Sequence, residues 1–208
     1  MLWLESKSRH HVHKQDPSDW IVRWCVEVHA MVDLDRLPSG PDSFVVGRLM
    51  ADEIRRYDVE EHGETIYEVG DSDSHGLLEA LTSLFPPDGV GGPDFSGIAE
   101  PFVLLHRFEL HPEFNEAKLA VLDSFCRIFG TESAIAFGYY ANWTLPELQR
   151  VGFEEFVPRS FDGGPRGKFM VRDNTMYTDY GPDDYPTAYP SGSEHHTRWL
   201  EQHGPWHE

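Results

Sequence analysis

Apolar and polar residues alternate along two segments near the start of the chain. From Trp20 to Val32, every second residue is apolar and several are β-branched, which predicts a β-strand with one buried face. A second strand is expected from Phe44 to about Tyr57, after a turn at residues 37–42 that contains two prolines and a glycine. Because the turn is short, we expect the two strands to pair as an antiparallel hairpin.

The middle of the chain predicts one helix and one internal boundary. Four leucines between residues 77 and 84 lie on one side of a helix, and the two prolines that follow would end it. Residues 58–75 are acidic and mixed in character. Residues 86–97 are rich in glycine and proline, so we interpret them as a connection between the two halves of the chain.

Strands and helices alternate in the second half of the chain. A strand at residues 102–110 is apolar on both faces in its first part, as expected of a central strand. A helix should follow, with Asn115 as its N-cap and apolar residues at helical spacing. The remaining expected elements are a strand at residues 134–140, a short helix at about 144–151, and strands at 153–157 and 168–172. This alternation predicts an α/β (α+β) fold, with a mixed twisted sheet flanked by helices.

The two ends of the chain differ from this central part. Residues 1–19 are polar and contain three closely spaced histidines, whereas residues 174–208 are rich in tyrosine, proline and acidic residues. We therefore expect a polar N-terminal segment, one domain over residues 20–173 and an extended C-terminal arm. The arm either packs on the domain through its aromatic residues or binds a partner.

The charge balance limits the kinds of ligand and partner. The 208 residues include 36 acidic residues against 17 lysines and arginines, for a formal net charge of −19. Nucleic acid and anionic lipid are recognised through basic surface, so neither is expected, and a basic protein is the favoured kind of partner.

Cysteine use and hydropathy indicate where the protein works. Cys25 and Cys126 are expected to be buried free thiols in a reducing compartment. The first residues contain no apolar stretch long enough for a signal peptide, and no segment reaches transmembrane length. These features predict a cytoplasmic protein without membrane association.

Histidines gather near both ends of the chain. Neither group has the HExxH or Cys/His spacing of a zinc site. Solvated or packing histidines are therefore the favoured interpretation, and no metal is expected. The glycine-rich residues 89–92 also lack the Lys-Ser/Thr that completes a phosphate-binding loop.

Three local patterns in the second half are similar to those of one enzyme superfamily. Residues 108–113 (FELHPE) resemble the end of its fourth strand, and residues 147–154 (ELQRVGFE) resemble its stretch around Gly-Phe. Asn142 stands about where members often have an asparagine. The chain therefore resembles the Gcn5-related N-acetyltransferase (GNAT) superfamily over residues 102–172. The resemblance implies a GNAT-like fold and acetyl-CoA as the cofactor.

The resemblance also implies a set of cofactor-binding residues at the end of the fourth strand and near the next two helices: Leu110, His111, Asn115, Lys118, Ala120 and Asn142. In the family, small residues here let backbone N–H groups close on the pyrophosphate. Ala120 fits this pattern, whereas Lys118 replaces a glycine and Glu116 adds a carboxylate that repels an anion. Lys118 either grips a phosphate with its side chain or belongs to a helix capped by its own residues.

Catalytic candidates come from the same region. Members of the family often use a carboxylate on the fourth strand as general base, and this indicates Glu109. Period-two spacing places Arg107, Glu109 and His111 on one face of the strand, so a structural Arg107–Glu109 ion pair is the alternative interpretation. The tyrosine that many members use as general acid corresponds to Leu148, and Tyr139 or the tyrosine after it is the nearest substitute.

Two functions remain open from the sequence. The first is acyl transfer from acyl-CoA to an amine, with Glu109 as the base. The second is a catalytically inactive GNAT-derived protein that binds or regulates through its acidic surface and C-terminal arm. A homodimer formed at a sheet edge is compatible with both.

Overall fold

One mixed sheet organises the protein. The computed structural model describes residues 2–9, 16–31, 43–86, 101–129, 133–138, 143–157 and 169–174. Within these ranges, seven strands pair in the order β1-β2-β3-β4-β5-β7-β6, and only β4 and β5 are parallel. The strands are β1 Leu2–Arg9, β2 Ile21–Met31, β3 Ser43–Ile54, β4 Phe102–Leu110, β5 Ala134–Phe137, β6 Glu154–Phe156 and β7 Phe169–Asp173.

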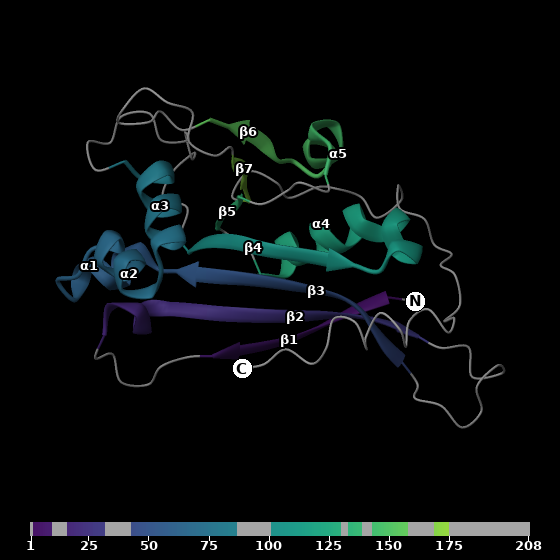
Figure 1. The fold of residues 1–208 in the computed structure, drawn as a ribbon, viewed down its shortest axis with the longest axis horizontal. Helices are drawn as coiled ribbons and strands as arrows, with labels where there is room; N and C mark the ends of the chain where they lie inside the picture. Colours follow the sequence, from purple (N-terminus) through teal and green to yellow (C-terminus); the bar gives the residue numbers. More distant parts are fainter. Residues whose placement is uncertain are drawn as a thin grey trace.

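Helices lie on both faces of this sheet, so the predicted α/β class is confirmed and the architecture is consistent with a GNAT-like fold. Three helices gather at one end of one face (Figure 1): α1 Arg56–Glu61, α2 Ile66–Asp73 and α3 His75–Leu84. The 3-10 helix η2 Pro112–Ala117 leads directly into α4 Lys118–Phe129, which covers the other face. The short elements η1 Pro17–Trp20 and α5 Leu145–Arg150 complete the described set.

The first half of β4 is buried on both faces, as its composition predicts. Leu105 belongs to a core cluster that includes Phe125 of α4. Leu104 belongs to a second cluster that includes Leu81 of α3. The sheet is therefore a layer between two apolar cores, and β4 runs through the middle of it.

The predicted hairpin is confirmed, but its surroundings differ from the prediction. β2 and β3 pair antiparallel, and β3 ends at Ile54, so that Tyr57 belongs to α1. The N-terminal segment expected to be merely polar contains β1, which pairs antiparallel with β2. Leu2 and Leu4 of β1 pack against the core, while the next positions on that face are serines. The apolar alternation of β1 is thus too short to be recognised in the sequence.

The acidic residues 58–75 also contain a helix that the sequence analysis did not predict. Thr65 and Glu68 form a capping box at the start of α2, in which each side chain accepts a hydrogen bond from the backbone N–H of the other. This Thr-x-x-Glu spacing is a recognised helix-start signal, and it precedes the buried Val69. The capping signal was present in the sequence despite the weak apolar pattern.

A buried ion pair ties the α4 side of the sheet together. Arg172 of β7 is 1% exposed and donates from Nη1 to Oδ1 of Asp123 on α4 at 2.8 Å. The same Nη1 donates to the carbonyl of Val151 after α5, and Arg127 donates to the second oxygen of Asp123 at 2.7 Å. Because each buried charge has several partners, the group fixes α4, β7 and α5 relative to one another.

Both cysteines are free thiols. Cys126 is fully buried, and burial raises the pKa of its thiol to about 12. Cys25 is half-buried, and desolvation raises its pKa as well, so both thiols are protonated at neutral pH. Among the described helices, none is long and apolar enough to cross a membrane.

Candidate functional site

β4 contains one residue that has no pairing partner on the neighbouring strand β3. Leu105 lies opposite Ala51 and Arg107 lies opposite Met50, so His106 forms a β-bulge between two consecutive pairs. A bulge leaves its extra residue outside the regular ladder and bends the strand. The bulge therefore exposes His106 in the centre of the sheet, next to residues that are fully buried.

The ladder between β4 and β5 also ends at this point. The parallel ladder runs from the pair Phe102–Ala134 to the pair Leu105–Phe137, whereas β4 continues to Leu110. From residue 106 onward, the backbone of β4 is no longer paired with β5. The bulge and the end of the β4–β5 ladder thus coincide within one residue.

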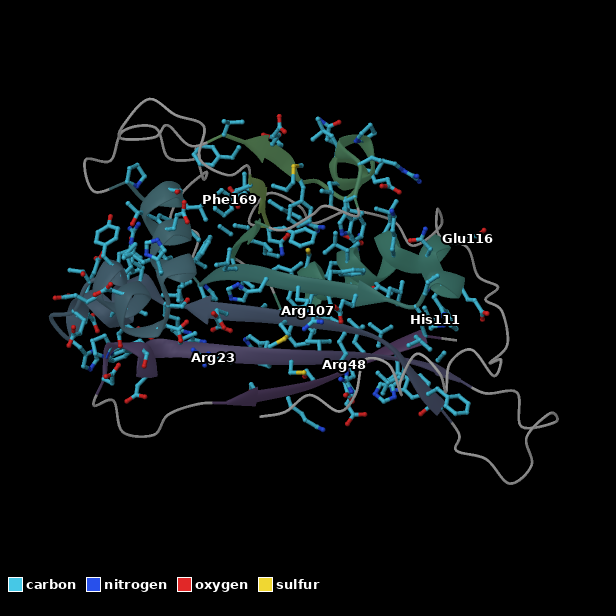
Figure 2. All side chains as sticks on the ribbon, viewed as in Figure 1. Arg23, Arg48, Arg107, His111, Glu116 and Phe169 are labelled. Atoms are coloured by element: carbon cyan, nitrogen blue, oxygen red, sulfur yellow. The ribbon has the colours of Figure 1, made fainter. Side chains whose placement is uncertain are left out.

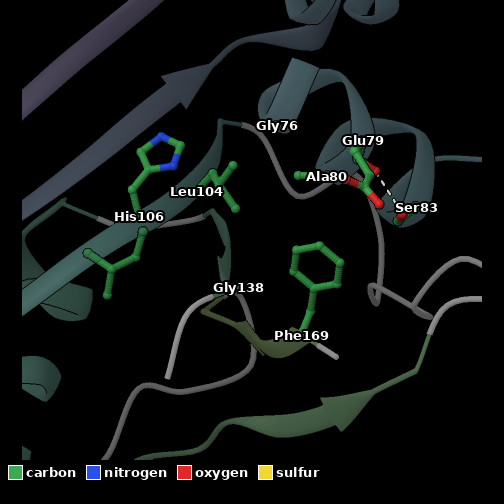
Figure 3. Close-up of a pocket in the computed structure, with 9 residues that line it drawn as sticks. Gly76, Glu79, Ala80, Ser83, Leu104, His106, Gly138 and Phe169 are labelled. Atoms are coloured by element: carbon green, nitrogen blue, oxygen red, sulfur yellow. Dashed lines mark hydrogen bonds between the residues drawn. The ribbon is translucent and has the colours of Figure 1, made fainter. Parts of the chain in front are cut away.

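A pocket of about 280 Å³ opens beside the bulge, on the side of β4 that faces α3. Figure 3 shows α3 on one side of it, β4 on another, and Phe169 with Gly138 on a third. We call this cavity the bulge pocket. Its lining residues are Gly76, Glu79, Ala80, Ser83, Leu104, Leu105, His106, Gly138 and Phe169.

His106 is the imidazole of this pocket. Its Nε2 lies 2.7 Å from Oδ2 of Asp52 on β3, and its side chain is 40% exposed, whereas Asp52 is 6% exposed as a residue. A carboxylate at this distance accepts a hydrogen bond, so Nε2 carries the proton in the neutral ring and Nδ1 keeps a free lone pair. A buried carboxylate that orients an imidazole is the arrangement of a general base.

Arg23 of β2 connects Asp52 to the helices. Its Nε lies 3.8 Å from Oδ1 of Asp52, and its Nη2 forms an ion pair with Asp73, the last residue of α2. Ser74 follows Asp73 directly and caps α3 with its side chain. A row of charged side chains therefore runs from the α2–α3 junction across β2 and β3 to the bulge pocket.

Glu109, the base expected from the sequence, lies outside the lining of the bulge pocket. Its Oε1 accepts a hydrogen bond from Nε of Arg107 at 2.6 Å, so the alternative Arg107–Glu109 ion pair is present. The residue that the structure brings to the pocket is His106, which the sequence analysis did not single out. The signal for it was the polar pair 106–107, which interrupts the alternation between Leu105 and Phe108.

The expected cofactor loop is a 3-10 helix that uses its own backbone donors. His111 is buried and caps η2, because its Nδ1 accepts from the N–H of Glu113 and its carbonyl accepts from the N–H of Phe114. Asn115 lies inside η2 and its carbonyl accepts from the N–H of Lys118, so the prediction that Asn115 caps α4 is wrong. The proline at the start of η2 and the His111 side chain begin the helical turn earlier than Asn115 could.

Lys118 is engaged by the protein itself. Its ammonium lies 2.7 Å from Oε1 of Glu147 on α5 and 4.9 Å from the centre of the Trp143 ring. The hydrogen bond from Lys118, supported by bonds from the backbone N–H and hydroxyl of Thr144, lowers the pKa of Glu147 to about 2. Lys118 therefore connects the start of α4 to α5, and its positive charge is balanced.

Trp143 is buried on the α4 side of the sheet, next to the point where the β4–β5 ladder ends. It is 8% exposed, and its ring lies 4.9 Å from that of Phe108 on β4 and 6.2 Å from that of Phe137 at the end of β5, both measured between ring centres. With Lys118 over its face, Trp143 forms a closed aromatic contact on this side of β4. We call Trp143, Lys118 and Glu147 the α4-side cluster.

The other predicted cofactor residues are scattered around this cluster. Leu110 packs against the core of the α4 side, and Ala120 is half-buried on α4. Glu116 is exposed in η2, at the end of the molecule where His111 also lies (Figure 2). Tyr139 and Asn142, the remaining candidates, fall outside the described residues.

Within the described ranges, no three side chains of His, Cys, Asp or Glu are arranged to hold a metal ion. The histidine groups near the two chain ends lie in segments that the structure does not describe.

Comparison with known proteins gives a structural likeness. No protein-family model and no curated protein matches the chain. The fold is similar to the polyamine N-acetyltransferase of Drosophila melanogaster, an enzyme that catalyses the formation of N-acetylagmatine, with a TM-score of 0.40 and 12% identity over 72% of this chain and 74% of that one. It is similar to an agmatine N-acetyltransferase in its apo form, with a TM-score of 0.39 and 12% identity over 71% of both chains. Similarity of this degree carries no argument about activity or substrate, so both rest on the site itself.

Proposed function

We propose that the protein is an acetyltransferase-like enzyme that transfers an acyl group to an amine bound in the bulge pocket. One observation carries this proposal: His106, oriented by the buried carboxylate of Asp52, lines a pocket beside the point where the β4–β5 ladder ends. An amine attacks an acyl carbon only as the free base, so the reaction needs a group that removes its proton.

His106 has the properties that this role requires. Its Nε2 is held by Asp52 at 2.7 Å, which leaves Nδ1 to take a proton from the amine. The carboxylate then stabilises the imidazolium that forms. The pocket is lined mainly by small and apolar residues, which limit the water that competes with the amine.

Acetyl-CoA is the acyl donor that the sequence resemblance implies, and the α4 side of β4 does not fit it. The N–H groups of Glu113 and Phe114 already have acceptors within the chain. The ammonium of Lys118 is paired with Glu147, and Glu116 contributes an exposed carboxylate. A diphosphate would have to displace these contacts, so the residues of the α4 side do not fit the pyrophosphate of coenzyme A.

The closed α4 side favours a second function, in which the protein binds an amine in the bulge pocket and transfers nothing. Trp143 is buried against Phe108 of β4 and Phe137 of β5, where an acyl donor on this face of the sheet would need space. It differs from the alternative expected from the sequence, an inactive protein that binds or regulates through its acidic surface and C-terminal arm, because here the binding site is the pocket.

Turnover with acetyl-CoA and a panel of primary amines, measured by release of free thiol, tests the proposed enzyme. His106→Gln retains an amide that can bond to Asp52 but cannot accept the proton. It is expected to lower kcat/KM by about 100-fold or more. Glu109→Gln is the matched control, because Glu109 lies outside the bulge pocket, and it should leave kcat/KM unchanged.

The opposite pattern would return the role of base to Glu109. Calorimetry with acetyl-CoA and with the amines separates the two functions. Wild-type protein that binds an amine, yet gives neither heat with acetyl-CoA nor thiol release, would reject the enzyme and support the binding protein.

A further inference from the structure

We infer that Arg23 is a positioning residue that sets the spacing between the base of the bulge pocket and the helical wall opposite it. The inference rests on the proposed function, in which His106 receives the proton of a bound amine. It extends that function to a residue on β2 that is not among those lining the pocket.

The first arm of Arg23 reaches the base. Its Nε lies 3.8 Å from Oδ1 of Asp52, while Oδ2 of the same carboxylate lies 2.7 Å from Nε2 of His106. The two oxygens of Asp52 therefore face different partners, and the guanidinium limits rotation of the carboxylate. Through Asp52, Arg23 keeps the proton on Nε2 of His106 and the lone pair on Nδ1.

The second arm of Arg23 reaches the wall. Its Nη2 pairs with Asp73 at the end of α2, and the following Ser74 is the N-cap of α3. The pocket residues Glu79 and Ser83 belong to α3. The position of this helix relative to β4 is thus linked to the same guanidinium that holds Asp52.

The exposure of Arg23 argues against a role confined to stability. Its side chain is 53% exposed, and ion pairs at such positions contribute little to folding. The planar guanidinium, however, presents several N–H donors in a fixed fork, so it can engage two carboxylates at once. A lysine offers a single ammonium and cannot reproduce both arms.

The two arms predict a split between kcat and KM. Asp52→Asn removes the charge that stabilises the imidazolium, so it should lower kcat about tenfold and leave KM near the wild-type value. Asp73→Asn loosens the wall, so it should raise KM about tenfold and leave kcat unchanged. Arg23→Gln should do both, and Arg23→Lys should restore one arm only.

A matched control is available at Arg55, directly after β3. Arg55 is 61% exposed and pairs with Glu53 at 3.1 Å, so Arg55→Gln removes an ion pair of the same kind. Neither residue lines the bulge pocket. Kinetic constants of Arg55→Gln should therefore equal those of the wild type.

Two measurements that need no turnover keep this inference separate from the proposed function. Nitrogen-15 NMR of His106 should report the Nε2–H tautomer in the wild type and in Asp73→Asn, and a mixture of tautomers in Arg23→Gln. Calorimetry with a primary amine should show about tenfold weaker binding for Arg23→Gln and Asp73→Asn, and unchanged binding for Asp52→Asn.

Different results would reject the proposed enzyme and the proposed role of Arg23. Wild-type protein without acyl transfer would reject the proposed enzyme, while tautomer and affinity would still decide the role of Arg23. An Arg23→Gln protein with the wild-type tautomer and wild-type amine affinity would overturn the inference, whatever its activity.

Discussion

The two sides of β4 differ in what occupies the space beside the strand. On the α3 side, the bulge at His106 borders a pocket of about 280 Å³. On the α4 side, the corresponding region contains Trp143, which is 8% exposed, with the ammonium of Lys118 against its ring. The difference comes from the bulge, which turns His106 toward the pocket, and from the side chains that the two flanking helices bring to β4.

The groups suited to proton transfer therefore lie on one side of β4, whereas the groups that the sequence assigned to cofactor binding lie on the other side. The α3 side keeps an imidazole, a carboxylate that orients it and space for a small ligand. The α4 side uses its cations and backbone donors for internal contacts. The α3 side of β4 is therefore open to a small ligand, whereas the α4 side is occupied by the protein's own side chains.

The largest expected effect comes from the ion pair beneath the α4 side. Asp123→Asn would leave the buried guanidinium of Arg172 without its charged partner, at a cost of about 3–5 kcal/mol in the free energy of unfolding. Urea denaturation measures the loss. Arg127→Gln removes the exposed partner of the same carboxylate and should cost at most about 1 kcal/mol. Equal effects of the two variants would contradict a stabilising role for burial at this pair.

A smaller effect, dependent on pH, is expected within the α4-side cluster. The pKa of Glu147 is lowered from an ordinary value of 4.5 to about 2, so its ionised form stabilises the fold. This contribution is fully present above pH 4.5 and is lost as the pH falls toward 2. Glu147→Gln should cost about 1–2 kcal/mol at pH 7, and its stability should converge with that of the wild type near pH 2.

Denaturation curves at several pH values test this convergence. Glu116→Gln is the matched control, because Glu116 is an exposed carboxylate of η2, two residues before Lys118. A constant difference between wild type and Glu147→Gln from pH 7 to pH 2 would show that the charge of Glu147 is not what stabilises the cluster.

The smallest expected effect on stability lies on the open side. Gly76 is the second residue of α3, and a Cβ added there meets no atom within 4 Å. Gly76→Ala should raise the free energy of unfolding by up to about 1 kcal/mol, because alanine favours helix. Gly76→Phe should fit as well, but its ring would occupy the bulge pocket and weaken amine binding. Calorimetry showing full amine affinity in Gly76→Phe would place the amine elsewhere.

Regular periodicity made much of the sheet predictable. β2 follows from its alternation of apolar and polar residues, and the short turn expected after it predicted that β3 pairs with it. β1 was missed because its inward positions after Leu4 are serines. α2 was missed because it is short and mixes apolar with acidic residues, although a capping box at Thr65 and Glu68 marks its start.

The site was predictable only in part. The sequence identified the correct strand, β4, and favoured Glu109 on it, but the structure pairs Glu109 with Arg107 outside the bulge pocket. Asp52 is 54 residues from His106 in sequence, and their contact depends on how β3 and β4 align at a bulge. No pattern of neighbouring residues in the sequence specifies such a contact. The bulge itself does leave a signal in the sequence, because two consecutive polar residues stand at 106–107.

The bulge on β4 also determines how the chain can change in length. Removing one residue from a central strand normally turns every later side chain to the opposite face. Here Leu105 and Arg107 pair with the consecutive residues Ala51 and Met50, so deletion of His106 would join two segments that are already in phase. Phe108 would keep its place beside Trp143. In this strand the residue proposed to take the proton is the extra residue of the bulge, so we expect its removal to leave the pairing of β3 with β4 in register.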